Sequence, residues 1–286
     1  MSLVMTMSSL RYRFPLDHKN LMFMVMIMVM FVIVMSLVGT KPQQNSEVIF
    51  LQETYSSVQT ARLWEAEWGG KMVACHGSTH SRGVMILFKP KINVSISNVI
   101  RDKNGRYILS ETVIDDLKLI FVNIHAPNDQ AQQVKFLRDL SNSVLNSYAN
   151  ETFVTGGDFD CPLNDFDKRG GRTIEHKKIV IQEMNNVMKT YDLIDIWQVN
   201  NRNVQGYTWS NPSMKIQCRL DYILLAEDFQ SSLKSVKIVP NVFSDHSAIS
   251  LVLALCEKEA ERGPGFWKFN NSLLADKEYI KLISKI

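Results

Sequence analysis

Short runs of β-branched and other apolar residues, separated by polar turns, recur along the chain and predict β-strands. They cover residues 83–88, 107–113, 117–124, 153–155, 220–225, 233–239 and 248–255. The dipeptide Asn104-Gly105 predicts a hairpin turn, because these residues readily adopt positive φ angles. Apolar residues at helical spacing predict one helix over residues 134–148 and a less regular one over 179–191. Many strands and few helices indicate a layered α/β sandwich.

An apolar segment near the N-terminus departs from this pattern. Residues 21–39 carry no charged side chain, and Arg11, Arg13 and Lys19 precede them. Because about 20 apolar residues can cross a bilayer as a helix, the segment predicts a single membrane span. Its richness in Val, Ile, Phe and Met makes a strand of the core the competing interpretation. We expect a disordered leader before it, over residues 1–20.

The composition bounds the domain count and the compartment. With 286 residues, 45% of them hydrophobic, the chain can bury one large core, so one domain and a monomer are expected. The net charge of +3 permits DNA binding without indicating it, because a nucleic-acid face is a local patch. The four cysteines lack zinc-type spacing, which favours reduced thiols and suits a nuclear or cytoplasmic location, whereas the apolar segment suits a single-pass membrane location, so both remain open.

Acidic residues follow three apolar runs, as if they stood on loops at strand ends. Residues 48–50 lead into Glu53, residues 153–155 lead into Asp158, and residues 236–239 lie shortly before Asp245 and His246. Carboxylate oxygens hold Mg²⁺, or Mn²⁺ as the alternative ion, and nearby donors and a base orient water for in-line attack at phosphorus. The sequence therefore predicts metal-dependent phosphodiester chemistry without a small-molecule cofactor.

Ordered motifs around these residues resemble the endonuclease/exonuclease/phosphatase superfamily, and specifically the endonuclease domain of LINE-type non-LTR retrotransposons. The motifs are FLQET (50–54), SRGV (81–84), VNIHAPN (122–128), GGDFD (156–160), YTW (207–209), RLDYIL (219–224) and SDH (244–246). The resemblance implies a four-layer, DNase I-like sandwich over residues 46–256, in which helices flank two packed, mostly antiparallel sheets. Residues 262–270 resemble the junction to reverse transcriptase, so 257–286 are expected to be a linker remnant.

The resemblance also implies roles for the acidic residues. Glu53 would bind the metal, and Asp158 would lie beside it and orient the attacking water. Asp245 would lie near the metal or near a catalytic imidazole. His246 would contact the scissile phosphate, as a general base or, when protonated, as a donor. Ser244 precedes this pair and is expected to support it.

Further residues are expected to support the site or to contact DNA. Asp221 would support the site by hydrogen bonding, Arg219 would touch the DNA backbone, and Thr208 would line the DNA-binding face. Asp160 stands where the resemblance expects asparagine, so an amide donor is replaced by a charge that repels phosphate or recruits a second cation. His125 stands where tyrosine is common, and its imidazole can still donate to a phosphate.

One feature of the family, its first strand with an asparagine, is not found in this sequence. The family begins with a strand that carries an asparagine near the metal, but residues 21–39 occupy that place and no strand with an asparagine precedes Glu53. We therefore weigh three functions. The first is a DNA endonuclease that nicks one strand to leave a 3′-hydroxyl, derived from a retrotransposon. The second is a catalytically dead fragment that keeps the fold and binds DNA weakly. The third is a membrane-anchored phosphodiesterase that contacts the bilayer through residues 21–39.

Overall fold

The computed structural model describes residues 31–38, 45–78, 80–90, 92–241, 244–254 and 280–281. The expected leader over residues 1–20 and most of the expected linker over 257–286 lie outside these residues. The chain divides into two units, Met1–Leu255 and Cys256–Ile286. All of the strands and helices named below belong to the first unit.

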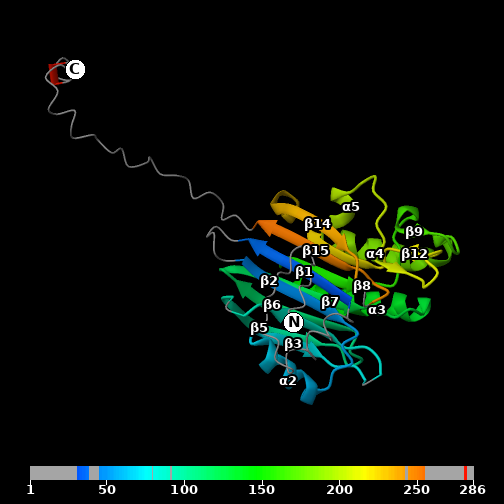
Figure 1. Cartoon of the computed structure of the whole chain (residues 1–286), viewed down its shortest axis with the longest axis horizontal. Helices are drawn as coiled ribbons and strands as arrows, with labels where there is room; N and C mark the ends of the chain where they lie inside the picture. The colour runs from blue at the N-terminus through cyan, green and yellow to red at the C-terminus, as the bar shows by residue number, and fades with distance from the viewer. Residues whose placement is uncertain are drawn as a thin grey trace, which may run out of the picture. The chain divides into compact units, whose positions relative to one another are not determined.

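Two sheets of six strands form the centre of this unit, in the orders β14-β15-β1-β2-β4-β3 and β10-β13-β8-β7-β6-β5 (Figure 1). Neighbouring strands are antiparallel except for β1 with β15 and β7 with β8. The strands of the first sheet are β1 (Phe31–Val38), β2 (Asn45–Gln52), β3 (Met72–Cys75), β4 (Val84–Phe88), β14 (Leu233–Val239) and β15 (Ala248–Ala254). Those of the second are β5 (Val94–Arg101), β6 (Tyr107–Ile114), β7 (Leu117–His125), β8 (Phe153–Asp158), β10 (Leu193–Asp195) and β13 (Asp221–Ala226).

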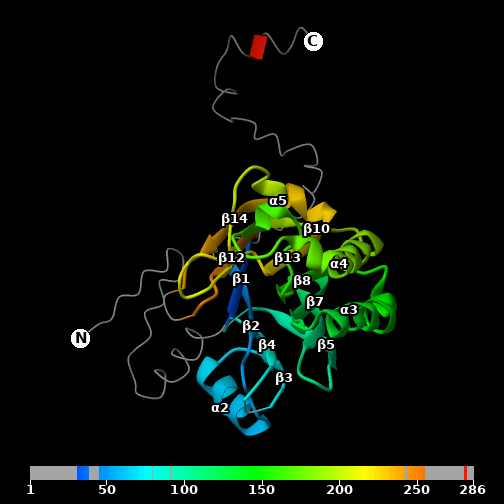
Figure 2. The ribbon, with the colours of Figure 1, turned by 90° about the vertical axis from the view of Figure 1, so that its right-hand side faces the viewer.

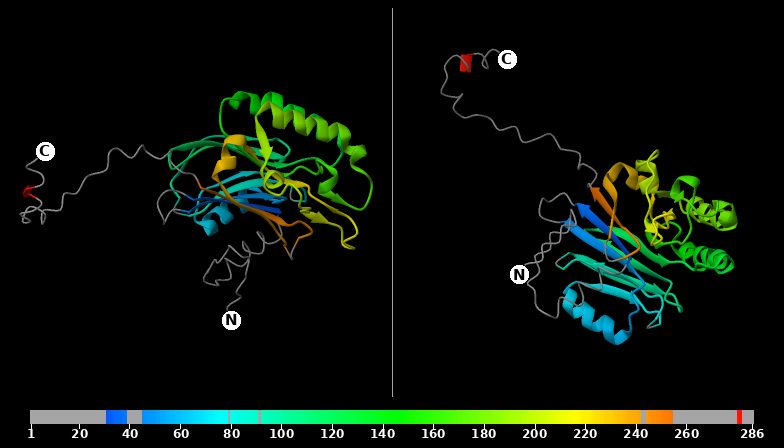
Figure 3. Two further views of the ribbon diagram at one scale, coloured as in Figure 1. Left: turned by 90° about the horizontal axis from the view of Figure 1, so that it is seen from above. Right: turned by 45° about the vertical axis from the view of Figure 1, so that its right-hand side comes forward.

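Helices cover the outer faces of both sheets. The helices are α2 (Val58–Trp68), α3 (Gln130–Ser143), α4 (Lys178–Thr190) and the short α5 (Ile196–Asn200). The 3₁₀ turns are η1 (Leu145–Tyr148), η2 (Asp165–Asp167), η3 (Ile174–Lys177) and η4 (Glu227–Ser232). A small third sheet has the order β11 (Trp209–Ser210), β12 (Gln217–Cys218), β9 (Lys168–Arg169). Figure 3 shows α3 and α4 on one side of the stacked sheets and α2 on the other.

The alternation of side chains along the strands builds the layers. In β2, Val48 and Phe50 join the core between the sheets, whereas Ile49 and Leu51 pack against α2. The central strands are buried on both faces, so they read as continuous apolar runs in the sequence. Apolar residues of β7 are likewise divided between the inter-sheet core and the core under α3 and α4. These cores confirm the four-layer sandwich, and Figure 2 shows α3 and α4 side by side on their flank.

The predicted strands and both predicted helices are present, but α2 was not expected. Its charged residues obscure the apolar stripe in the sequence. A capping box starts the helix, in which Ser57 and Thr60 exchange side chain to backbone hydrogen bonds. Gly69, with a φ of +68°, ends it in the left-handed conformation. Caps thus define this helix where periodicity does not.

The apolar N-terminal segment contributes strand β1, which lies between β2 and β15 in the first sheet (Figure 1). β1 is antiparallel to β2, with Phe31 opposite Gln52, and parallel to β15. Both edges of β1 are therefore hydrogen-bonded to neighbouring strands. β1 thus occupies the place of the first strand of the family, and neither β2 nor β15 is left with an unpaired edge there. Phe31–Val38 contains no asparagine, as the sequence indicated.

The expectation of a single-pass membrane protein is wrong. Among the described residues, no helix is long and apolar enough to cross a bilayer. The second half of the 21–39 segment is a strand of the core, and residues 21–30 lie outside the described part. The hypothesis of a membrane-anchored phosphodiesterase was based on this segment and is no longer supported.

Replacing Met35 with aspartate is expected to lower the free energy of unfolding by about 4 kcal/mol, because a buried methionine is lost and a carboxylate is left in the core. Met35 is 1% exposed and belongs to the core between the sheets. Urea denaturation of the full chain measures the change. The control, Met35→Leu, conserves volume and should cost less than about 1.5 kcal/mol. Equal midpoints for M35D and wild type would show that β1 is not part of the core.

Candidate functional site

Three neighbouring strands of the second sheet place three of the expected residues in one row. β7 ends at His125, β8 ends at Asp158, and β13 begins at Asp221. In the strand register, Asp158 lies opposite His125 on one side and opposite Asp221 on the other. Because directly paired residues point to the same face of a sheet, the imidazole and the two carboxylates form one group at the sheet edge.

Glu53 reaches this row from the first sheet. It follows the last residue of β2, and its Oε1 lies 3.6 Å from Nε2 of His125. Its φ of +53° is a left-handed conformation that is uncommon for a glutamate. Tyr55, with a φ of +46°, donates a hydrogen bond from its hydroxyl to Oε2 of Glu53 over 2.8 Å. The backbone and Tyr55 together hold this carboxylate beside His125.

A buried amide sets the spacing of the two sheets beneath Glu53. Nδ2 of Asn123, in β7, donates to the carbonyl oxygens of Leu51 (2.9 Å) and Met85 (2.7 Å) in the other sheet. Its Oδ1 accepts a hydrogen bond from Nε2 of Gln52 over 2.5 Å. Asn123 and Gln52 have no exposed surface. This bridge therefore fixes the sheets relative to each other next to the site.

His246 is paired with Asp221. Nδ1 of His246 lies 2.8 Å from Oδ2 of Asp221, and both residues are buried. Burial lowers the pKa of His246, but the charge and hydrogen bond of Asp221, with Asp158 and Asp245, outweigh it and raise the pKa to about 9. The hydroxyl of Ser244 accepts a hydrogen bond from the backbone N–H of His246 over 3.1 Å. At neutral pH, His246 is therefore an imidazolium held by Asp221.

Asp245 lies on the exposed side of the site. Its Oδ2 accepts a hydrogen bond from Nε1 of Trp209 over 2.8 Å, and its carbonyl oxygen accepts one from the backbone of Ser210. Burial, the hydrogen bond to Glu53 and the charges of Glu53 and Asp245 raise the pKa of Tyr55 to about 12.

Asp158 is a buried carboxylate at the centre of the row. Burial and the charge of Asp221 raise its pKa well above the usual value. Its Oδ1 accepts a hydrogen bond from the backbone N–H of Asp160 over 2.8 Å. Gly157 has a φ of +138°, and a Cβ there would lie 1.9 Å from the carbonyl oxygen of Ile124. Only glycine therefore lets β8 approach β7 at this point.

Residues 34–246 match the model of the Endonuclease/Exonuclease/phosphatase family. The chain belongs to this family. A curated relative is the "Transposon TX1 uncharacterized 149 kDa protein" of Xenopus laevis, 25% identical over 243 residues. The alignment covers 84% of this chain but only 18% of that relative.

Solved structures with the same fold include two DNA-processing enzymes. The 3′ phosphatase NExo from Neisseria, bound to a product DNA hairpin, has a TM-score of 0.56 at 18% identity, covering 72% of this chain and 88% of that one. The AP endonuclease LMAP from Leishmania major has a TM-score of 0.56 at 13% identity, covering 82% of this chain and 97% of that one. At these identities the likeness establishes the fold.

The acidic residues of this family member fit a hard divalent cation. Ligand atoms of Asp158, Asp221 and His246 lie within 4.8 Å of one another, and all three residues are buried. The carboxylate of Asp221 in this cluster also pairs with Nδ1 of His246. Burial and the neighbouring Asp221 raise the pKa of Asp158, and a bound cation would oppose both effects.

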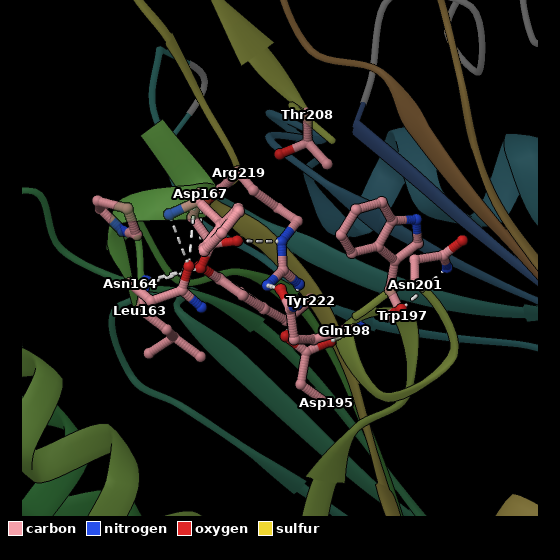
Figure 4. A network of polar contacts seen from close by, with 12 residues as sticks. Leu163, Asn164, Asp167, Asp195, Trp197, Gln198, Asn201, Thr208, Arg219 and Tyr222 are labelled. Atoms are coloured by element: carbon pink, nitrogen blue, oxygen red, sulfur yellow. Dashed lines mark hydrogen bonds and ion pairs between the residues drawn. The ribbon is translucent and has the colours of Figure 1, made fainter. Parts of the chain in front are cut away.

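Arg219 is internal, so the expected contact with the DNA backbone is wrong. It has no exposed surface, and its Nε and Nη1 lie 2.7 Å from Oδ1 of Asp167 and 2.5 Å from Oδ2 of Asp195 (Figure 4). Its guanidinium lies 4.9 and 4.5 Å from the ring centroids of Trp197 and Tyr222. Burial lowers its pKa, but Tyr222 and the two carboxylates outweigh burial and raise it. Arg219 is thus a charged structural residue.

Thr208 is also internal, and the expectation that it lines a DNA-binding face is wrong. It is 1% exposed. Its Oγ1 accepts hydrogen bonds from the backbone N–H groups of Leu220 (2.9 Å) and Asp221 (3.1 Å). Thr208 therefore holds the start of β13, and with it the carboxylate that pairs with His246.

The two departures from the family pattern both lie at the site. Burial and the charge of Arg106 lower the pKa of His125 to about 4, so its imidazole is neutral at pH 7 and its approach to Glu53 is not a salt bridge. Burial raises the pKa of Asp160, and Lys177 opposes this shift. Asp160 thus has a basic neighbour, with Nζ of Lys177 3.6 Å from its Oδ2.

Sequence reasoning missed three residues that shape the site. Asn123 was noted within a motif and given no role, although a polar residue inside an apolar strand is a recognisable signal for a buried bridge. Tyr55 follows the Glu53 motif, and only the structure shows its hydrogen bond. Lys177 carried no signal, since 17 positions separate it from Asp160.

Proposed function

We propose that this chain is a divalent-metal-dependent DNA endonuclease that hydrolyses one strand to leave a 3′-hydroxyl, and that it derives from a non-LTR retrotransposon. The observation that carries the proposal is the joint position of Glu53, His125, Asp158 and the Asp221–His246 pair at one edge of the two sheets. The motifs and the transposon relative support the origin, and the DNA hairpin bound to the Neisseria enzyme supports the substrate class.

Each residue would contribute a separate part of the chemistry. Glu53, Asp158 and Asp245 would hold Mg²⁺ or Mn²⁺, and the bound ion would supply stabilisation of charge on the phosphoryl oxygens. His246 would donate to the phosphate, because Asp221 keeps it protonated at neutral pH. Asp158, which lies beside Asp221 and His246, would orient the attacking water and accept its proton. This assignment favours the donor role for His246 over the general-base role.

The first test is the nicking of supercoiled plasmid by the purified full chain with Mg²⁺. The double variant Glu53→Ala, Asp158→Ala is expected to lower the rate by about 10³-fold or more, because it removes the principal ligands and the proton acceptor. The control Asp139→Ala removes an exposed carboxylate on α3 and should leave the rate within about twofold of wild type.

The same assay decides between the endonuclease and the catalytically dead fragment. The fragment interpretation rests on Asp160, on His125 and on the absence of asparagine from β1. A wild-type rate equal to that of the double variant, at every Mg²⁺ and Mn²⁺ concentration, would establish the fragment and refute the endonuclease.

A further inference from the structure

Lys177 connects three segments around the loop that follows Asp158. Its Nζ lies 3.6 Å from Oδ2 of Asp160 and donates to the carbonyl oxygen of the same residue over 3.1 Å. It also donates to Oε1 of Gln133, in α3, over 3.0 Å. Gln133 in turn donates from Nε2 to the carbonyl oxygens of Phe159 (2.6 Å) and Asp160 (3.2 Å). The loop is therefore held from both the α3 and the η3 side.

This loop orients the central carboxylate. The backbone N–H of Asp160 donates to Oδ1 of Asp158, and Asp160 keeps the required left-handed conformation with a φ of +46°. Asparagine and aspartate tolerate this conformation better than most residues. The backbone conformation at position 160 therefore suits the aspartate of this chain as well as the asparagine that the family resemblance leads us to expect.

Aspartate and asparagine differ at this position in charge. The carboxylate of Asp160, when ionised, carries a negative charge that an amide lacks, and it would repel an anionic phosphodiester that approaches Asp158. Lys177 is the basic partner of this carboxylate, and its side chain is only 13% exposed. Limited exposure reduces the screening of the pair by water and salt.

We propose that Lys177 is a positioning residue that neutralises Asp160, so that the pair takes the place of a neutral amide and admits a DNA phosphate beside Asp158. This inference rests on the proposed function, because it concerns the approach of DNA to the same site. Lys177 acts through Asp160 and does not itself react.

The experiment is a double-mutant cycle on the full chain, with the variants K177M, D160N and K177M/D160N. Two quantities are measured for each: the Kd of a fluorescent DNA duplex with Ca²⁺ in place of Mg²⁺, and the KM and kcat of nicking with Mg²⁺. K177M should raise Kd and KM by about 10-fold or more, since it leaves one charge uncompensated near the phosphate. In the D160N background, loss of Lys177 should change Kd and KM by less than about threefold. The control K135M removes an exposed lysine of α3 and should match wild type.

Rescue by D160N separates charge compensation from a structural role. If Lys177 only braces the loop through Gln133 and the carbonyl of Asp160, K177M will have the same effect in both backgrounds, and the inference is overturned. Thermal unfolding of each variant shows whether the variant is folded. A K177M chain that unfolds while K177M/D160N folds supports the inference, and failure of both to fold overturns it. If the wild-type chain binds and nicks DNA and the effects of K177M and D160N are additive, only the inference is refuted. One that neither binds nor nicks refutes the proposed function and the inference with it.

Discussion

Replacing His246 with glutamine is expected to lower the rate of DNA nicking by about 10²- to 10⁴-fold, the usual contribution of a positioned acid or base. Glutamine keeps a donor group but not the positive charge that Asp221, Asp158 and Asp245 maintain on the imidazole. The rate is measured on supercoiled plasmid with saturating Mg²⁺. The matched control is His176→Gln, which changes an exposed imidazole in η3 and should alter the rate by less than about twofold.

The pH dependence of folding tests the same pair without any metal. The net effect of the site is to raise the pKa of His246 from 6.5 to about 9. A raised pKa in the folded state means that the pair stabilises the fold fully below pH 6.5 and that this stabilisation is lost as the pH rises through about 9. In EDTA, wild type should lose stability over this range and Asp221→Asn should lose much less. Parallel curves for the two chains would show that Asp221 does not hold the proton on His246.

Replacing Arg219 with methionine is expected to lower the free energy of unfolding by about 3–5 kcal/mol, the cost of removing one partner from a buried ion pair. The change would leave Asp167 and Asp195, which are 1% and 7% exposed, without their guanidinium. It would also remove the stacking on Trp197 and Tyr222, which contributes about 0.5–2 kcal/mol per ring. Urea denaturation of the full chain measures the loss.

A surface ion pair supplies the matched control for Arg219. Nε of Arg138 lies 3.0 Å from Oε2 of Glu183, and the arginine side chain is 58% exposed. Arg138→Met should cost no more than about 1 kcal/mol, because water screens an exposed pair. Equal losses for the two variants would mean that the Arg219 network is no more stabilising than a surface contact. Because Arg219 lies two residues before Asp221, we also expect R219M to weaken nicking.

Strands and helices were predicted correctly where a single hydrophobic pattern runs through the whole segment. Central strands such as β4 and β7 are buried on both faces, so their apolar runs were visible without knowledge of their partners. α2 was missed because its ends are set by the Ser57 capping box and by Gly69, while its exposed face carries mixed charges. The interpretation of residues 21–39 could not be settled, because an apolar run suits a bilayer as well as a two-sided core strand.

The site divides in the same way. The sequence by itself indicated a layered α/β sandwich and acidic residues after apolar strands, because these depend on residue type and order along the chain. The family and the four-layer arrangement came from the resemblance of its motifs to a known family. Only the tertiary structure decided that β1 completes the first sheet, that Arg219 and Thr208 are internal, and that Lys177 meets Asp160. The physical reason is that each of these facts depends on contacts between residues far apart in the sequence. Burial and charge pairing there arise from packing, which no local pattern records.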